Sequence, residues 1–429
     1  MIVILPFHAF LTVWLASVVD HYTLLRLWKE LLLVILTAGA LYFLIKDGRL
    51  RQQIVNSRLA QLIAAYFLVS LVWSGMAYAL EKTTVKALGF GLIVNLRFLT
   101  FFIVIWIIAT KSQWLKKAWP KLLLIPASIV ILIGLLQRLV LPYDVLKHFG
   151  YSAETIFPYQ TINYDINYTR IMSTLRGANP LGAYLILVLS ILAIFFLKFK
   201  QQRWLWSVFG LSGLLVLFFS YSRGAWIGLA LSGLFLAWLT LRRDKSKQLL
   251  LGVLGVLLII AAVFAFVLRD NPTFENYFFH TNDRSTIKES SNEAHVSAFR
   301  KGLNDIAREP LGRGIGTAGP ASVYNKGKVR VPENYFIQIA QEVGWVGLVV
   351  FLAINFLVAR ELWFRKEDTL ARILLVSLLG LTAVNLVSHA WTDDTLAYIW
   401  WGLAGIALAP AILTERKRKR HAKNHKKTS

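Results

Sequence analysis

The chain has 429 residues, of which 56% are hydrophobic, and it contains 15 tryptophans and no cysteine. Apolar stretches of about 20 residues, enough to cross a bilayer core of ~30 Å, recur along its whole length, which excludes a soluble globular protein. The net charge of +24 would indicate nucleic-acid binding in a soluble protein, but a basic tail and basic loops between apolar stretches indicate membrane topology instead.

Hydropathy predicts an all-α polytopic membrane protein with twelve spans. In chain order we expect them at 3–19, 24–45, 59–80, 85–109, 122–141, 174–197, 204–221, 224–241, 249–268, 334–359, 371–390 and 397–413. The first stretch is expected to be retained, because no cleavable signal peptide stands apart from the spans. Residues 1–413 then form a single multi-span membrane domain, and 414–429 form a basic cytoplasmic tail that touches anionic lipid.

Charge sorting between alternate loops predicts the orientation. Loops such as 46–58, 110–121 and 360–372 are rich in Lys and Arg, whereas the opposite connections carry acids and bases in near balance. Because basic loops stay in the cytoplasm, both termini are expected inside. Two long connections, 142–173 and 269–333, are then extracytoplasmic loops, and the larger lies between spans nine and ten.

Residues 269–333 are predicted to contain a helix and a glycine-rich segment. "SSNEAHVSAFRKGLNDIAREPLG" has a capping-box start, an apolar stripe (Val296, Phe299, Leu303, Ile306) and a stop at Pro310, so we expect an amphipathic helix lying on the membrane surface. The following "GRGIGTAGP" lacks the Lys-Ser/Thr of a nucleotide P-loop. It is interpreted either as a flexible connection or as a backbone nest for an anion.

Several polar residues in the apolar spans or near their outer ends need an explanation, Arg223 in "FFSYSRGAWIG" above all. A charge near the membrane interface costs less than one at the bilayer centre, and small neighbours let another group approach it closely. The same outer half holds further candidates: Arg97, Arg170, Arg176, Asn179, His295, Glu333, Asn334, Glu342, His389, Asp393 and Asp394.

Structural alternatives are weighed for four of these. Arg97 could serve only to pair with Glu342 and hold the bundle together. Asp393 and Asp394 could be a solvated turn, and His295 could be a surface histidine.

Several arginines with carboxylates and a histidine at a membrane surface favour a lipid-linked phosphate as ligand. Guanidinium groups bind phosphate oxygens bidentately, and fixed cations stabilise a departing diphosphate. A glutamate or histidine can take the proton of an acceptor hydroxyl. No metal-ligand pattern is present, so neither a metal nor another cofactor is expected.

The order of these segments resembles the O-antigen ligase and O-antigen polymerase superfamily of bacterial membrane glycosyltransferases. The resemblance rests on "TRIMSTLRGANPLGAYL", "FFSYSRGAWIGLALSGL", "NEAHVSAFRKGLNDIAREPLGRGIGTAG" and "ENYFIQIAQEVGWVGLVVF", all between residues 168 and 351. It implies a donor glycan on undecaprenyl diphosphate, an active site on the outer face of the cytoplasmic (inner) membrane, and an inverting, metal-independent transfer.

Residue by residue, the resemblance implies that Arg223, with Arg170 or Arg176, binds the diphosphate, and that Asn179 matches a family asparagine. Glu333 and Asn334 stand where ligases typically have His-Asn, and His295 stands where ligases often have arginine. Whether Glu333 or His295 is the catalytic base stays open, with Asn334, Asn179, Arg97 and Asp394 as supporting residues.

The favoured hypothesis is therefore a glycosyltransferase that moves an oligosaccharide from a polyprenyl-diphosphate carrier to an acceptor hydroxyl of a glycan, lipid or protein. The alternatives are a transporter or flippase for a lipid-linked or anionic glycan, and a non-catalytic scaffold. A transporter would be expected to show paired halves with broken helices, and the sequence has no internal repeat.

Overall fold

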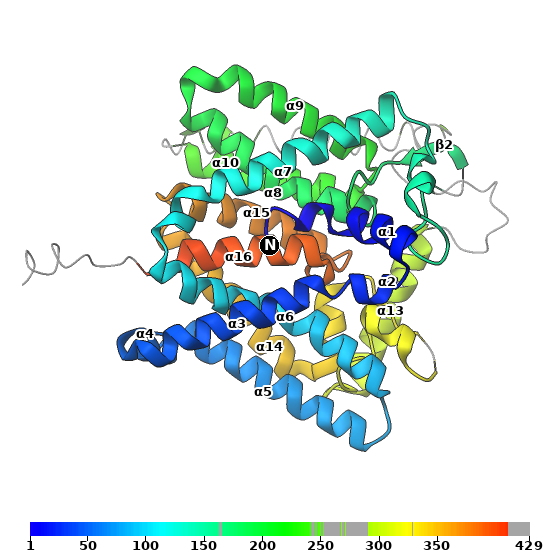
Figure 1. The fold of residues 1–429 in the computed structure, drawn as a ribbon, viewed down its shortest axis with the longest axis vertical. Helices are drawn as coiled ribbons and strands as arrows, with labels where there is room; N and C mark the ends of the chain where they lie inside the picture. The colour runs from blue at the N-terminus through cyan, green and yellow to red at the C-terminus, as the bar shows by residue number, and fades with distance from the viewer. Residues whose placement is uncertain are drawn as a thin grey trace, which may run out of the picture.

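A computed structural model describes residues 1–162, 165–241, 291–327 and 329–410, with a few isolated positions between 245 and 271. The described part is a bundle of roughly antiparallel helices with one short β-hairpin (Figure 1). The α-helices are α1 (His8–Val19), α2 (Tyr22–Leu25), α3 (Trp28–Lys46), α4 (Gly48–Val55), α5 (Arg58–Ala79), α6 (Val85–Lys111), α7 (Gln113–Leu139), α8 (Ala178–Lys198), α9 (Arg203–Phe219), α10 (Arg223–Thr240), α13 (Ser291–Arg308), α14 (Tyr335–Phe364), α15 (Thr369–Asn385) and α16 (Asp394–Leu408). The 3-10 turns are η1 (Leu5–Phe7), η2 (Val145–Phe149), η3 (Lys200–Gln202), η5 (Gly319–Tyr324) and η6 (Ala390–Thr392).

Eight helices among the described residues are long and apolar enough to cross a membrane, which confirms an all-α membrane protein. They correspond to the predicted spans two to eight and span ten. The helices at the predicted spans one, eleven and twelve are shorter, and 249–268 lies outside the described residues. The number twelve therefore stays a prediction.

The core lies between α6 and α16. Their aromatic rings pack edge to face or tilted, as Phe98 and Phe102 do on Trp401, with ring centroids 5.3 and 5.9 Å apart. The indole of Trp106 donates a 3.0 Å hydrogen bond to the carbonyl oxygen of Leu408, so the tryptophan satisfies its polar atom inside the bundle.

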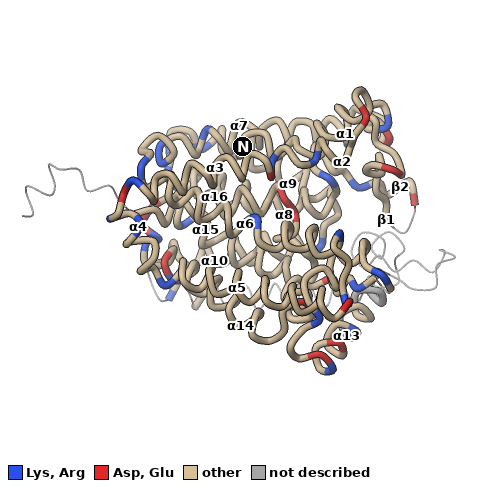
Figure 2. Tube along the Cα trace, turned by 60° about the horizontal axis from the view of Figure 1, so that its bottom comes forward, with Lys and Arg blue, Asp and Glu red and all other residues tan. Residues whose placement is uncertain are grey.

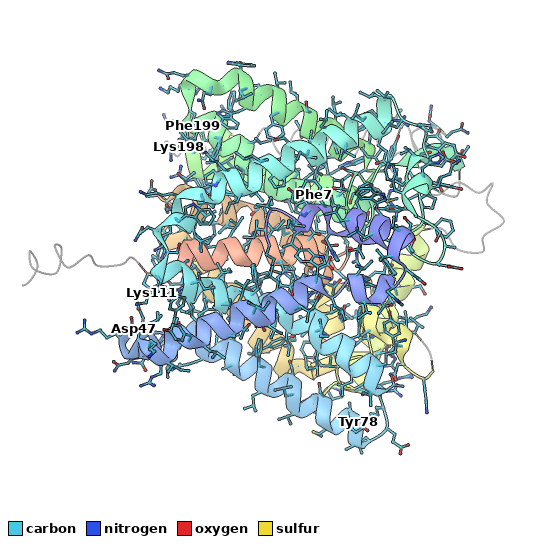
Figure 3. The ribbon with its side chains drawn as sticks, viewed as in Figure 1. Phe7, Asp47, Tyr78, Lys111, Lys198 and Phe199 are labelled. Atoms are coloured by element: carbon cyan, nitrogen blue, oxygen red, sulfur yellow. The ribbon has the colours of Figure 1, made fainter. Side chains whose placement is uncertain are left out.

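Lys, Arg, Asp and Glu residues lie mainly at the two ends of the bundle, with few of them along the band between (Figure 2). Asp47, Lys111 and Lys198 lie at one end (Figure 3), where Lys111 and Asp47 form an ion pair. Strand β2 and helix α13 lie at the other end (Figure 1). The basic loops thus share an end, as the charge sorting predicts, and we refer to the opposite end as the site end.

The predicted outer loop 142–173 contains a β-hairpin that the all-α prediction lacks. Strands β1 (Gln160–Ile162) and β2 (Asp165–Arg170) pair antiparallel, with Gln160 opposite Arg170. Loop residues such as "TINYDINYTR" are rich in β-branched and aromatic types, which fit a strand better than a helix.

Helix α13 forms where the stripe predicts a helix. Val296, Phe299 and Leu303 expose about half of their surface, whereas Ile306 is buried against Ile337 of α14. Three exposed apolar side chains in one stripe are consistent with the predicted surface-lying helix.

Helix α14 is broken at Gly344, whose backbone has φ 66° and ψ −172°. The break frees the carbonyl oxygens of Gln341 and Glu342, and the backbone amides of Arg313 and Gly314 each bond one of them at 2.8 Å. The glycine-rich segment thus completes the broken helix, because backbone groups at membrane depth must be hydrogen-bonded inside the protein.

Candidate functional site

A cavity of about 930 Å³ opens at the site end, between the hairpin, the start of α8 and the end of α15. Four predicted site residues line it together: Arg170, Arg176, Asn179 and Glu333. Other lining side chains are Gln160, Pro320, Ser388, His389 and Asp393. Residues far apart in the sequence therefore meet in one chamber with mixed polar and apolar walls, which we call the arginine cavity.

Arg170 is held in place by hydrogen bonds from its guanidinium group. Nε donates to the carbonyl oxygen of Ser220 at 2.9 Å, and Nη2 donates to Oδ1 of Asn179 at 2.6 Å. Burial, and then the neighbouring charge of Arg223, lower the pKa of Arg170 to about 10, so it stays charged at neutral pH. Asn179 thus orients an arginine in the cavity wall.

Arg176 pairs with Asp393 across the cavity, with Nε 3.2 Å from Oδ2. Nearly half of the Arg176 side chain is exposed, whereas Asp393 is buried at the start of α16. The Asp393 carboxylate orients Arg176 through its Nε atom, and the exposed part of the Arg176 side chain lines the cavity.

The first turn of α8 lines the same chamber, although its Pro180 has no N–H and the amide of Leu181 donates to the carbonyl oxygen of Gly177. Its N-cap, Gly177, provides no side-chain cap, and only Gln160 Oε1 accepts from the amide of Ala178, at 3.0 Å. A helix N-terminus and two arginines together favour an anion.

Glu333 lies on the opposite wall in a left-handed backbone conformation, with φ 56°. Ser173 and Tyr221 share this conformation, and all three precede helices that begin at the site end. Such a conformation costs about 1–3 kcal/mol for a residue with a side chain, and it occurs most often at functional sites.

His389, a candidate from the sequence to which no role was assigned, also lines the cavity. Burial, with Arg176 adding to it and Glu333 opposing it, lowers the pKa of His389 to about 4, so the imidazole is neutral at pH 7. Its Nε2 is buried without a hydrogen-bond partner in the described part of the chain.

Arg223 is the first residue of α10 and is half-buried beside Arg170. It is not among the side chains that line the arginine cavity. The structure therefore brings Arg170 and Arg176 into the chamber and leaves Arg223 adjacent to it.

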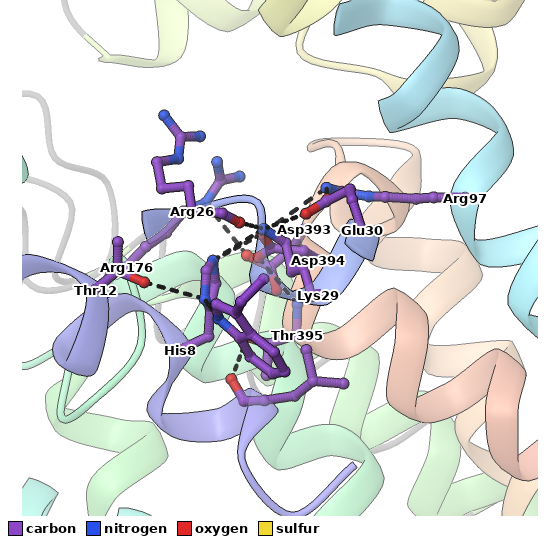
Figure 4. A network of polar contacts seen from close by, with 12 residues as sticks. His8, Thr12, Arg26, Lys29, Glu30, Arg97, Arg176, Asp393, Asp394 and Thr395 are labelled. Carbon is purple, nitrogen blue, oxygen red and sulfur yellow. Dashed lines mark hydrogen bonds and ion pairs between the residues drawn. The ribbon is translucent and has the colours of Figure 1, made fainter. Parts of the chain in front are cut away.

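Arg97 and Asp394 belong to a buried ionic network behind the cavity wall (Figure 4). Arg97 Nη1 lies 3.1 Å from Glu30 Oε1, and its Nη2 donates to the carbonyl oxygen of Thr392 at 2.9 Å. Asp394 Oδ2 lies 3.2 Å from Lys29 Nζ and 3.3 Å from His8 Nε2.

One structural alternative is therefore wrong in its partner and another is wrong altogether. Arg97 does hold helices together, but it pairs with Glu30 of α3 and not with Glu342. Asp393 and Asp394 are largely buried, and each has a cationic partner that compensates its charge. They are therefore not a solvated turn. Asp393 lines the cavity, and Asp394 supports it from behind.

Glu342 is buried against the glycine-rich segment. Its Oε1 accepts from the backbone amide of Gly316 at 2.8 Å, and its Oε2 accepts from Nδ2 of Asn95 at 2.9 Å. The segment is buried from residue 314 to 319, so the flexible-connection interpretation is wrong. Its backbone does bind a carboxyl group, which is that of the chain's own Glu342.

Two predicted residues remain. Asn334 is buried and caps α14, accepting from the amide of Ile337 at 3.0 Å and donating to the carbonyl oxygen of Leu386 at 2.9 Å. The backbone of His295 lies in α13, and its side chain is outside the described part of the structure.

Within the described residues, no group of three His, Asp or Glu side chains is placed to hold a metal ion.

The fold and this chamber define a polytopic helical membrane protein with a cavity at one end of its bundle that is lined by two arginines and two carboxylates. Residues 208–352 match the family model described as O-Antigen ligase, which confirms for this segment the resemblance to the O-antigen ligase and polymerase superfamily. A search of curated proteins gave no match. The matched segment contains Arg223 and Glu333, whereas Arg170, Arg176, Asn179 and His389 lie outside it and reach the cavity only through the fold.

Proposed function

We propose that this protein is a membrane glycosyltransferase that moves an oligosaccharide from a polyprenyl-diphosphate carrier to an acceptor hydroxyl. The observation that carries the proposal is the arginine cavity, where Arg170, Arg176 and the start of α8 face Glu333. The match to the O-antigen ligase family supports glycan transfer in the membrane.

The cations bind the diphosphate of the donor. Guanidinium groups stay charged in a partly dry chamber and stabilise negative charge that grows on the leaving diphosphate. Arg223 adds to the positive potential from beside Arg170. The carrier's lipid chain remains in the membrane next to the bundle.

Glu333 acts as the base. The acceptor oxygen attacks the anomeric carbon from the side opposite to the carrier, and its proton passes to the Glu333 carboxylate. The bond between the anomeric carbon and the diphosphate oxygen breaks, the carrier diphosphate leaves with the electron pair, and the anomeric configuration inverts. Glu333 lines the cavity that holds the arginines, and this supports its role as the base.

The site end is extracytoplasmic in this proposal, and both termini lie in the cytoplasm of a bacterial cell, with the protein in the cytoplasmic membrane. The sorting of basic loops to the opposite end supports this orientation. A site on this side has no access to ATP, so the energy of transfer comes from the donor's own glycosyl–diphosphate bond. The acceptor is a glycan, a lipid or a protein.

The test uses purified protein in detergent with a labelled polyprenyl-diphosphate-linked glycan and membrane extract as the acceptor source. We expect Arg176→Ala and Arg223→Ala to reduce transfer by about 10²-fold or more, and Glu333→Gln to reduce it by 10²-fold to 10⁴-fold. Arg138→Ala is the matched control, since Arg138 stacks over the Phe219 ring outside the cavity.

Full transfer by Arg176→Ala together with Arg223→Ala would exclude the diphosphate site. A transporter or flippase would leave the labelled donor unconverted in detergent, where there is no membrane to cross. A scaffold would tolerate every one of these substitutions in cells.

A further inference from the structure

A second polar cavity, of about 500 Å³, lies beside the arginine cavity at the site end. It is lined by α13, the glycine-rich segment, residues 325–327 and 329–332, and the turn between α5 and α6. Pro332 lines this cavity and the next residue, Glu333, lines the arginine cavity, so one extended stretch of chain separates the two. We call it the lysine cavity.

The lysine cavity has a positive rim. Lys82, Lys301 and Lys326 are exposed at its edge and come from three distant segments. None of them has an ion-pair partner among the residues that the structure describes. Within the described part of the chain, three cations without an ion-pair partner thus surround one opening, which favours an anionic ligand.

The walls below the rim are electrically balanced and fixed. Arg330 Nη1 lies 3.3 Å from Glu309 Oε2 and its Nε lies 3.7 Å from Asp305 Oδ2, while Arg313 lies 3.8 Å from the other oxygen of Glu309. The two carboxylates neutralise the charge of both arginines. The net positive charge of the cavity is therefore that of the lysines.

The loop that carries Lys326 is tied to the turn that carries Lys82. Asn325 Oδ1 accepts from the amide of Thr84 at 3.1 Å, and its Nδ2 donates to the carbonyl oxygen of Lys82 at 3.0 Å. The hydroxyl of Thr84 donates to the carbonyl oxygen of Tyr324 at 2.8 Å. The backbones that carry these two lysines are thus held at a fixed spacing.

Gln341 forms part of the floor and is 4% exposed. Its Nε2 donates to Asp305 at 2.9 Å, but its amide oxygen is buried without a hydrogen-bond donor among the described residues. A buried acceptor without a donor is costly, and a sugar hydroxyl is a suitable donor.

Building on the proposed transferase function, we propose that the lysine cavity is the acceptor subsite and binds an acidic sugar, with its carboxylate or phosphate on the lysine rim and a hydroxyl over Gln341. This placement sets the acidic sugar beside the stretch of chain that carries Glu333, the base, with the attacking hydroxyl of the acceptor on the arginine-cavity side of that stretch. It assigns donor and acceptor to separate cationic sites.

The test is calorimetric titration of the full-length protein in uncharged detergent with trigalacturonate and with glucose 6-phosphate, and with maltotriose as the neutral sugar. We expect the anionic sugars to bind more tightly than maltotriose. Lys301→Ala/Lys326→Ala should weaken their binding about tenfold, because two charged contacts are lost.

The matched control is Arg300→Ala/Arg308→Ala, which removes two exposed cations from the same helix outside the cavity. It should change the affinity less than twofold. Equal weakening by both pairs, or no preference for the anionic sugars, would overturn the proposal. Displacement of the anionic sugars by phosphatidylglycerol in nanodiscs would also overturn it, since the cavity would then hold a lipid headgroup.

Arg176→Ala separates this inference from the proposed function. It should reduce transfer by about 10²-fold or more and leave the binding of anionic sugars unchanged. Unchanged transfer in Arg176→Ala would refute the donor site while the lysine-dependent binding still stood.

Discussion

Replacing Arg97 by leucine should destabilise the protein strongly, because Arg97 balances a buried ionic network. Arg97 and Lys29 are two cations that face two carboxylates, Glu30 and Asp394, and the Arg97 side chain is 8% exposed. Arg97→Leu removes one cation, so the network is left with a net negative charge inside the bundle.

The expected cost is about 3–5 kcal/mol, the usual penalty for removing one partner of a buried ion pair. Most of that cost is the uncompensated carboxylate and not the lost attraction. The double variant Arg97→Leu/Glu30→Leu restores charge balance, with Lys29 still facing Asp394 at 3.2 Å. We therefore expect it to recover most of the stability.

The assay is a double-mutant cycle on melting temperatures in detergent, with Arg97→Leu, Glu30→Leu and the double variant. The single variants should lose roughly 5 °C or more. Glycan transfer should also fall, because Arg97 donates a hydrogen bond to the carbonyl oxygen of Thr392, and Thr392 lines the arginine cavity. A double variant as unstable as the sum of the two single variants would refute the charge-balance reasoning.

Three further predictions follow from single residues. His389→Gln should reduce the loss of stability between pH 7 and pH 4. The buried imidazole has a pKa of about 4 against about 6.5 in the unfolded chain, so the unfolded chain binds more protons and the wild type loses up to about 3 kcal/mol on acidification. A melting temperature that falls with pH as steeply in the variant as in the wild type would count against this. Gly316→Ala should destabilise the protein by about 2–5 kcal/mol, because its φ is 87° and the new Cβ would lie 2.5 Å from the Ala87 carbonyl oxygen. Gly327→Ala is the control, since Gly327 has φ 102° and open space around its Cβ position. Equal melting temperatures of the two variants would contradict the contact argument. Asn334→Ala should cost about 1 kcal/mol or more by removing the cap of α14, whereas Asn334→Ser should keep part of it; identical stabilities would show that the cap contributes nothing.

The ends of the long helices were predictable from the sequence. The hairpin turn before Arg223, the stop of α13 before Pro310 and the start of α14 at Asn334 all agree with the capping and hydropathy patterns to within a few residues. These features depend on local chemistry, because caps and apolar periodicity act within one or two helical turns.

The partners of the polar residues were not predictable. Arg97 pairs with Glu30, Glu342 binds the backbone of the glycine-rich segment, and Asp393 rather than Asp394 lines the cavity. Each outcome depends on which helix faces which, and neighbouring residues such as the two aspartates point to different sides of a chain that turns between them.

The sequence by itself determined that this is a helical membrane protein, which end of its spans carries the basic loops, and which arginines needed an anionic or acidic partner, because the cost of placing charge in an apolar solvent is local. Only the tertiary structure decided that Arg170, Arg176, Glu333 and His389 share one chamber and that three lysines surround a second. Their meeting depends on packing between segments up to more than two hundred residues apart, and no local pattern in the chain encodes that distance.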